Sequence, residues 1–238
     1  MSLENRTVVI TGATGGLGSL LAHDLAARKA NLALLDRDAN LLSALLETLA
    51  LPETNLFGRV LNLLDSNETQ YAASEIAEKF GRIDIVLHVV GGWTGGKTLL
   101  EAAPSDLEFM LNQHIWTSFN VVQAFVPHLV KNAWGRIIMI TSPFAARPNS
   151  KGGPYAMGKA GQEALMLALS QELQGSGVTA NLLQAKTIDI KREKISSPSS
   201  QNASWTTPEE ISTAVQFLLS EEAGTINGAK IPLYGGYN

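Results

Sequence analysis

The sequence predicts an α/β fold, in which a doubly wound, seven-stranded parallel sheet carries helices on both faces within a single domain. Seven short apolar runs alternate along the chain with six longer segments of helical periodicity. The apolar runs are continuous, which is typical of strands covered on both faces. Strands joined by helices form a parallel sheet, and right-handed crossovers place the helices on its two sides.

Local patterns place each element. The first strand is rich in β-branched residues, the fourth is mostly apolar, and leucines at positions 17, 20, 21 and 25 have the spacing of one helix face. In chain order, we expect strands at Thr7–Ile10, Asn31–Leu35, Leu56–Leu61, Ile83–Val90, Arg136–Ile140, Val178–Leu183 and Lys230–Leu233. Between them we expect helices at Leu17–Arg28, Ala39–Leu49, Asn67–Phe80, about Ser105–Lys131, Pro154–Gln174 and Thr207–Ser220.

Length and composition indicate one globular domain over residues 1–238. The chain has 238 residues, of which 45% are hydrophobic and 17% charged. Its net charge of −4 gives no reason to expect a nucleic-acid partner. The absence of cysteine excludes disulfides and thiolate catalysis. No apolar run is long enough for a membrane span and no signal-peptide pattern opens the chain, so we expect a cytoplasmic protein without membrane contact.

One polar segment interrupts the pattern in the last third of the chain. Residues 191–194 are charged, and residues 196–202 consist of serine, proline, glutamine and asparagine. We expect a mobile substrate loop at about residues 186–206, which is either a lid over a site or a plain surface loop. Trp205, at the end of this loop, is expected to anchor it.

A glycine-rich turn follows the first strand. Thr11–Gly18 reads T-G-A-T-G-G-L-G, and its glycines allow a bound group to approach the backbone. The helix that begins there offers free N–H groups and a positive dipole end to a pyrophosphate. We therefore expect a dinucleotide site, although the spacing differs from the commoner G-x-G-x-x-G. A turn that only packs the helix on the strand is the alternative.

The residues after the second strand bear on the choice of dinucleotide. A carboxylate at Asp36 can accept hydrogen bonds from the adenosine ribose hydroxyls and would repel a 2′-phosphate. Arg37 could pair with that phosphate, but Gly15 adds no second cation. We therefore favour NAD and leave NADP possible. Asp36 could also serve as a helix N-cap.

Tyr155 and Lys159 lie four residues apart, on one face of a predicted helix, and Ser142 precedes them just beyond a strand. An ammonium about 4 Å away would lower the pKa of a phenol from about 10 by up to about three units, while burial opposes this shift. The tyrosine is then an acid–base group and Ser142 can bind the substrate oxygen. Asn112, in the long central helix, could open a turn and hold a water, or be an ordinary polar residue.

The four histidines indicate neither a catalytic group nor a metal site. His88 lies on an apolar strand and is expected to be a core histidine rather than a catalyst. His23, His114 and His128 show no metal-ligand spacing with carboxylates, so we expect no metal site.

Together these motifs resemble the short-chain dehydrogenase/reductase family over essentially the whole chain. Thr11–Gly18 matches the family's glycine motif, and Gly228–Gly236 looks like its closing strand. The resemblance implies a Rossmann fold, hydride exchange between an alcohol and a carbonyl, and a homo-oligomer, either a tetramer or a dimer, formed through the fifth and sixth helices. It implies the catalytic residues Asn112, Ser142, Tyr155 and Lys159. It also implies NAD(P) contacts from Gly12, Thr14, Gly15, Gly16, Leu17, Gly18, Asp36, Arg37, Asn62, Leu63, Val89, Gly91, Tyr155, Lys159 and Ile188.

Three segments depart from the family pattern. His88–Gly91 stands where the family has N-N-A-G, Ala185 and Lys186 replace P-G, and Ile190 replaces a hydroxyl residue. These positions support the cofactor pockets.

A narrower resemblance joins Gly91–Gly96, Ile115–Ser118 and Ser204–Thr206 to dihydropteridine reductase and to related bacterial oxidoreductases. The main hypothesis is an NAD(P)-dependent oxidoreductase acting on a small alcohol or carbonyl. A pterin reductase and a non-catalytic dinucleotide-binding regulator are the alternatives.

Overall fold

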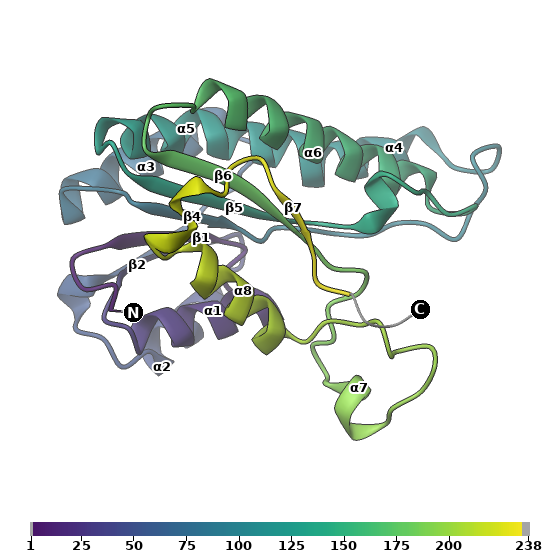
Figure 1. Cartoon of the computed structure of the whole chain (residues 1–238), viewed down its shortest axis with the longest axis horizontal. Coiled ribbons are helices and arrows are strands. Elements are labelled where there is room, and N and C mark those ends of the chain that lie inside the picture. Colours follow the sequence, from purple (N-terminus) through teal and green to yellow (C-terminus); the bar gives the residue numbers. More distant parts are fainter. Residues whose placement is uncertain (1, 235–238) are drawn as a thin grey trace.

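Seven parallel strands form one sheet in the order β3-β2-β1-β4-β5-β6-β7 (Figure 1). The computed structural model describes residues 2–234. The strands are β1 Thr7–Thr11, β2 Asn31–Asp36, β3 Leu56–Val60, β4 Ile85–His88, β5 Gly135–Thr141, β6 Val178–Gln184 and β7 Lys230–Pro232. The chain order reverses between β1 and β4, and ligands bind in such sheets beyond the carboxyl ends of the strands at this point.

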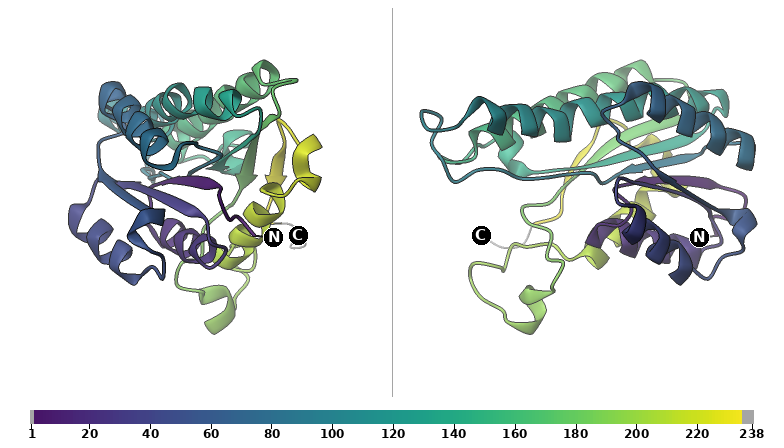
Figure 2. Two further views of the ribbon diagram at one scale, coloured as in Figure 1. Left: turned by 90° about the vertical axis from the view of Figure 1, so that its left-hand side faces the viewer. Right: turned by 180° about the vertical axis from the view of Figure 1, so that it is seen from behind.

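Helices cover both faces of the sheet, as the side views show (Figure 2). One face carries α1 Gly16–Ala26, α2 Ala39–Thr48 and α8 Pro208–Leu218. The other carries α3 Ser66–Phe80, α4 Pro104–Leu111, α5 Thr117–Lys131 and α6 Gly153–Glu172. A short helix, α7 Glu193–Ser196, projects away from these layers on its own loop. Single helical turns lie at Glu53–Asn55, Pro143–Ala145 and Glu222–Thr225. None of the helices in residues 2–234 has the length and apolarity that a membrane span requires.

The strands alternate their side chains between two hydrophobic cores. Val8 and Ile10 pack under α1 and α8, whereas Val9 between them packs against the α3–α5–α6 layer. All three are fully buried. This alternation explains the continuous apolar runs in the sequence, because both faces of every central strand need apolar side chains.

The predicted fold class is confirmed, with three local differences. The strand predicted at Ile83–Val90 is shorter, because Val89 and Val90 leave the sheet to line a cavity. The helix predicted at about Ser105–Lys131 is interrupted by a π-helical turn at Asn112–Trp116. The loop at 186–206 contains α7. The last two glycines of the closing-strand motif lie outside the described residues.

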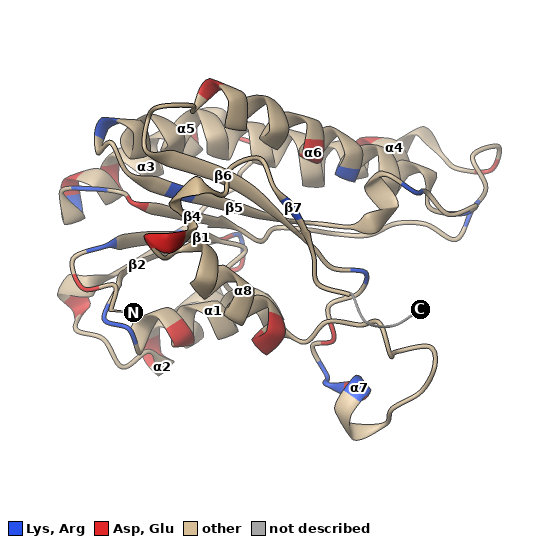
Figure 3. Ribbon diagram, viewed as in Figure 1, with Lys and Arg blue, Asp and Glu red and all other residues tan. Residues whose placement is uncertain are grey.

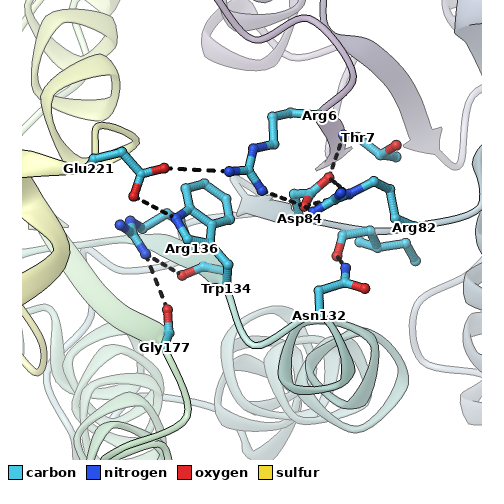
Figure 4. Close-up of polar contacts among 11 residues, drawn as sticks. Arg6, Thr7, Arg82, Asp84, Asn132, Trp134, Arg136, Gly177 and Glu221 are labelled. Atoms are coloured by element: carbon cyan, nitrogen blue, oxygen red, sulfur yellow. Dashed lines mark hydrogen bonds and ion pairs between the residues drawn. The ribbon is translucent and has the colours of Figure 1, made fainter.

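An ion network ties the amino-terminal edge of the sheet together (Figure 4). The side chain of Asp84 is fully buried and accepts hydrogen bonds from Arg6 Nη1 at 3.1 Å and from the backbone N–H of Thr7 at 2.9 Å. Arg82 Nε donates to both carboxylate oxygens, at 2.8 and 2.9 Å. One carboxylate therefore joins the start of β1 to the segment that leads into β4.

The same network extends through the indole of Trp134 to Glu221, just before the helical turn at Glu222–Thr225. The guanidinium of Arg6 stacks on the Trp134 ring at 3.8 Å from its centroid, and that of Arg136 does so at 4.4 Å. The indole N–H of Trp134 donates to Glu221 at 3.0 Å. These contacts fix the end of the sheet that faces away from the cavities described below.

We predict that Asp84→Asn lowers the free energy of unfolding. Removing the buried charge leaves two arginines without their common partner. The cost should be about 2 kcal/mol, less than for a fully buried pair because both guanidinium groups are partly exposed. Denaturant titration measures this change. Glu221→Gln is the matched control, because the Glu221 side chain is 68% exposed and its loss should cost less than about 1 kcal/mol. An Asp84→Asn protein as stable as the control would contradict this account of the network.

Candidate active site

Two adjoining cavities lie beyond the carboxyl ends of the strands and share Gly12, Gly15, Val89, Val90 and Gly91. Their volumes are about 680 and 300 Å³. The larger is lined by the predicted dinucleotide residues Gly12, Thr14, Gly15, Asp36, Arg37, Asn62, Leu63, Val89 and Gly91. The smaller is lined by the predicted residues Gly16, Leu17, Gly18, Tyr155, Lys159 and Ile188.

The glycine-rich turn has the backbone geometry of a cradle. Gly12 has φ of 72°, in the left-handed region, and its N–H donates to Leu35 O at 2.9 Å. A Cβ on Gly18 would lie 2.3 Å from the carbonyl oxygen of Gly12, so only glycine fits there. The first turn of α1 then opens toward the cavities with N–H groups that have no helical partner. The turn therefore fits the pyrophosphate of a dinucleotide.

Asp36 closes the far end of the larger cavity. Its carboxylate accepts hydrogen bonds from the backbone N–H groups of Thr14 at 2.9 Å and Arg37 at 2.7 Å. The N-cap of α2 is Asp38, which binds the N–H groups of Asn40 and Leu41. Asp36 is therefore not the helix cap, and its carboxylate is held in the wall of the larger cavity.

The loop at residues 186–206 has more internal order than its composition suggested. Asp189 is 2% exposed, and its carboxylate accepts the backbone N–H groups of Glu193 and Lys194, which begin α7. Lys194 pairs with Glu210 at 2.7 Å on α8. Figure 3 shows basic positions at the start of α7 and acidic positions at the start of α8. Asp189, which precedes the charged residues 191–194, was the signal in the sequence for α7.

The loop also touches the glycine-rich turn. Ile190 packs so closely over Gly16 that a Cβ there would lie 2.7 Å from its side chain. Thr206, rather than Trp205, is the buried anchor at the end of the loop: it is fully buried and donates its hydroxyl to Leu233 O at 2.8 Å. Trp205 is only half-buried.

Tyr155 lines the smaller cavity, and Ser142 is buried beside it. Ser142 is fully buried directly after β5, and its hydroxyl is hydrogen-bonded to that of Tyr155 in the first turn of α6. Burial raises the pKa of Tyr155, and the Ser142 hydrogen bond offsets only part of that rise. The expected lowering by Lys159 is therefore wrong for this state, because desolvation is the larger effect.

Lys159 lies one turn further along α6 and is 4% exposed. Its ammonium donates to Ile140 O at 2.7 Å and to Gln162 Oε1 at 3.0 Å, both of which are neutral. Burial lowers the pKa of Lys159 to about 7, and the nearby charge of Glu163 opposes this shift.

Glu163 continues the same face of α6 behind Lys159. It is 5% exposed and accepts hydrogen bonds from Thr141 Oγ1, Gln184 Nε2 and Lys230 Nζ, each at 3.0 Å. The carboxylate therefore joins α6 to β5, β6 and β7 underneath the cavity. Sequence reasoning missed Glu163, although its i+4 spacing from Lys159 was the available signal.

The π-helical turn brings His114, not Asn112, to this cavity. Asn112 is only half-buried and lines neither cavity, although it begins the turn as the sequence reading allowed. His114 is fully buried, lines the smaller cavity and packs edge-on against Tyr155, with ring centroids 5.6 Å apart. From the sequence alone, His114 was considered only as a possible metal ligand.

His88 is a core histidine, as predicted. It is fully buried, and Nδ1 lies 2.7 Å from Thr11 Oγ1. Burial is the main cause that lowers its pKa to about 3, so the ring is neutral. His88 thereby links the end of β1 to the end of β4.

Comparison with known proteins identifies the family. A model of the short chain dehydrogenases matches residues 6–198. The chain belongs to the short-chain dehydrogenase family. As a member it is an NAD(P)-dependent oxidoreductase, and this outcome argues against the non-catalytic regulator.

Named relatives of this dehydrogenase align over nearly its whole length. The 3-oxoacyl-[acyl-carrier-protein] reductase of Thermotoga maritima is 27% identical and covers 99% of both chains. A subunit of (2S)-[(R)-hydroxy(phenyl)methyl]succinyl-CoA dehydrogenase from Thauera aromatica is 25% identical, over 99% of this chain and 98% of its own. A short-chain dehydrogenase/reductase structure from Mycobacterium ulcerans superposes with a TM-score of 0.90 at 22% identity, over 100% of this chain and 91% of its own.

We predict that Glu163→Gln shifts the pH dependence of this dehydrogenase. Removing the carboxylate lowers the pKa of Lys159 further, so the basic limb of kcat/KM moves to lower pH by about one unit. Lys230→Gln should move the limb the opposite way, because it leaves Glu163 without its competing cation. Rate–pH profiles of both variants measure the shifts, and equal shifts of one sign would show that Glu163 does not act through charge.

Proposed function

We propose that this dehydrogenase reduces a small carbonyl compound, with Tyr155 as the general acid. The observation that carries the proposal is that Tyr155 and Lys159 line a cavity shared with the glycine-rich turn, with Ser142 hydrogen-bonded to Tyr155. Burial raises the pKa of Tyr155, so the phenol holds its proton at neutral pH and can donate it to a bound carbonyl oxygen.

Each residue has a distinct part in this reaction. Ser142 and Tyr155 bind the carbonyl oxygen, and Tyr155 passes its proton to that oxygen as it gains charge. The ammonium of Lys159 stabilises the phenolate that remains. The glycine-rich turn holds the pyrophosphate of the dinucleotide and Asp36 its adenosine ribose. When bound, the dinucleotide supplies the hydride.

The relatives suggest a first substrate class. Two of them act by name on oxoacyl or acyl-CoA compounds. Large apolar side chains are exposed near the start of α4 and on the loop of α7, in keeping with an acyl chain; they are Trp93, Leu99, Leu100 and Ile195. We propose a ketone as the substrate, and 3-oxoacyl thioesters and hydroxyketones are the first two classes to compare. The pterin alternative rests on Trp93 and Trp205 and is tested with the same assay.

The rate of carbonyl reduction by the Tyr155→Phe variant should be about 10²–10⁴-fold lower, which is the usual contribution of a positioned proton donor. NADH and NADPH oxidation is followed with short 3-oxoacyl thioesters, aliphatic ketones, hydroxyketones and a quinonoid dihydropterin. The ring is kept, so dinucleotide affinity should change little and serves as the control. A variant with most of its activity would remove Tyr155 from the mechanism, and turnover of the dihydropterin alone would favour the alternative.

NADH should bind more tightly than NADPH. The larger cavity is lined by two carboxylates, Asp36 and Asp38, against one guanidinium, Arg37, so a 2′-phosphate meets net repulsion. Fluorescence titration of both reduced dinucleotides measures the difference. Asp36→Asn should reduce the difference in affinity between NADH and NADPH, while Arg37→Gln should increase it. Tighter binding of NADPH by the unaltered protein would mean that Arg37 dominates.

We further propose a homo-oligomer and a loop that moves on binding. The outer faces around α5 and α6 expose Trp116, Phe119, Val130 and Met157, which suits contact with a second copy. A mass measurement in solution decides between monomer, dimer and tetramer. Because Ile190 packs on Gly16, the proposed movement of the loop at 186–206 would accompany binding of a pyrophosphate at the glycine-rich turn.

A further inference from the structure

One buried nitrogen beside Tyr155 has no hydrogen-bond partner. Among residues 2–234, five buried side-chain atoms lack a partner, and only His114 Nδ1 belongs to a residue that lines either cavity. Leaving a buried polar atom unpaired costs free energy, so a ligand that reaches this nitrogen from the cavity that His114 lines would gain by pairing with it.

The proton of the ring can be assigned. His114 Nε2 lies 3.0 Å from the carbonyl oxygen of Gly92, which can only accept, so Nε2 carries the proton. Burial, with the charge of Lys159 second, lowers the pKa of His114 to about 3, so the ring does not take up another. His114 Nδ1 is therefore a bare acceptor at neutral pH.

The ring is also held in place. Ser118 Oγ donates to the backbone carbonyl of His114 at 2.6 Å, across the π-helical turn. Gln162 Nε2 donates in turn to Ser118 Oγ at 3.0 Å, and Gln162 also accepts from Lys159. The acceptor is thus fixed relative to Lys159 and Tyr155, as a recognition group must be.

We propose that His114 Nδ1 recognises the substrate by accepting a hydrogen bond from an O–H or N–H group next to the reacting carbonyl. This inference rests on the proposed function and deepens it: the preferred substrates are carbonyl compounds that carry a donor beside the carbonyl carbon. A buried water is the other donor that could occupy the same place.

Two substitutions separate the two ring nitrogens. The amide nitrogen of His114→Gln reaches the place of Nε2, keeps the bond to Gly92 and removes the Nδ1 acceptor. The amide of His114→Asn stands near the place of Nδ1 and gives up the bond to Gly92. Loss of the Gly92 contact and loss of the acceptor are therefore measured in different proteins.

The assay compares acetoin with 2-butanone, which differ by one hydroxyl beside the carbonyl. The unaltered protein should prefer acetoin in kcat/KM by about tenfold, the worth of one hydrogen bond. His114→Gln should lose this preference and His114→Asn should keep most of it. If all three proteins treat the two ketones alike, the proposal is overturned. A loss of rate in His114→Gln that is equal for both ketones overturns it in favour of a water.

A second measurement depends on neither turnover nor a variant. The ¹⁵N resonance of His114 Nδ1 in the complex with NAD⁺ should move upfield on addition of acetoin and stay in place with 2-butanone. An unmoved resonance contradicts the proposal even where acetoin is reduced, so failure here is distinct from failure of the proposed function, which would show as no carbonyl reduction at all.

Discussion

The buried ammonium of Lys159 organises the site. It is 4% exposed, and its hydrogen-bond partners, Ile140 O and Gln162 Oε1, are neutral groups. Burying a charge is unfavourable unless it is hydrogen-bonded, so these bonds fix α6 against β5. They thereby set Tyr155 beside Ser142 at the end of that strand. Glu163 compensates the charge from behind without reaching the cavity.

The amino-terminal and carboxyl edges of the sheet differ in their contacts. At the amino-terminal edge, Asp84 and three arginines cross-link β1, β4 and β5 through short contacts. At the carboxyl edge, the strands end in glycines and small polar residues that leave two cavities open. The ion network holds one edge, while the other keeps a left-handed glycine, a buried lysine and an unpaired histidine nitrogen.

Much of this was readable from the sequence because it depends on local patterns. The side-chain period of two and continuous apolar runs predicted the strands, and the glycine spacing after β1 predicted the phosphate turn. Tyr155 and Lys159 share a helix face by spacing alone. What spacing alone could not show depends on tertiary structure. A π-helical turn inserts an extra residue and rotates the following side chains, so His114 instead of Asn112 faces the cavity. The pKa of Tyr155 depends on burial that spacing does not reveal.

The most direct test of this account is the titration of the Lys159 side chain by NMR in the dinucleotide-free protein, with Lys159→Met used to assign its signal. The structure predicts a midpoint at about 7, because the ammonium is buried among neutral partners. The signal should titrate apart from those of the exposed lysines. A midpoint near the ordinary lysine value of about 10.4 would show that the group is solvated, and would contradict the buried charge from which the acid–base account of Tyr155 follows.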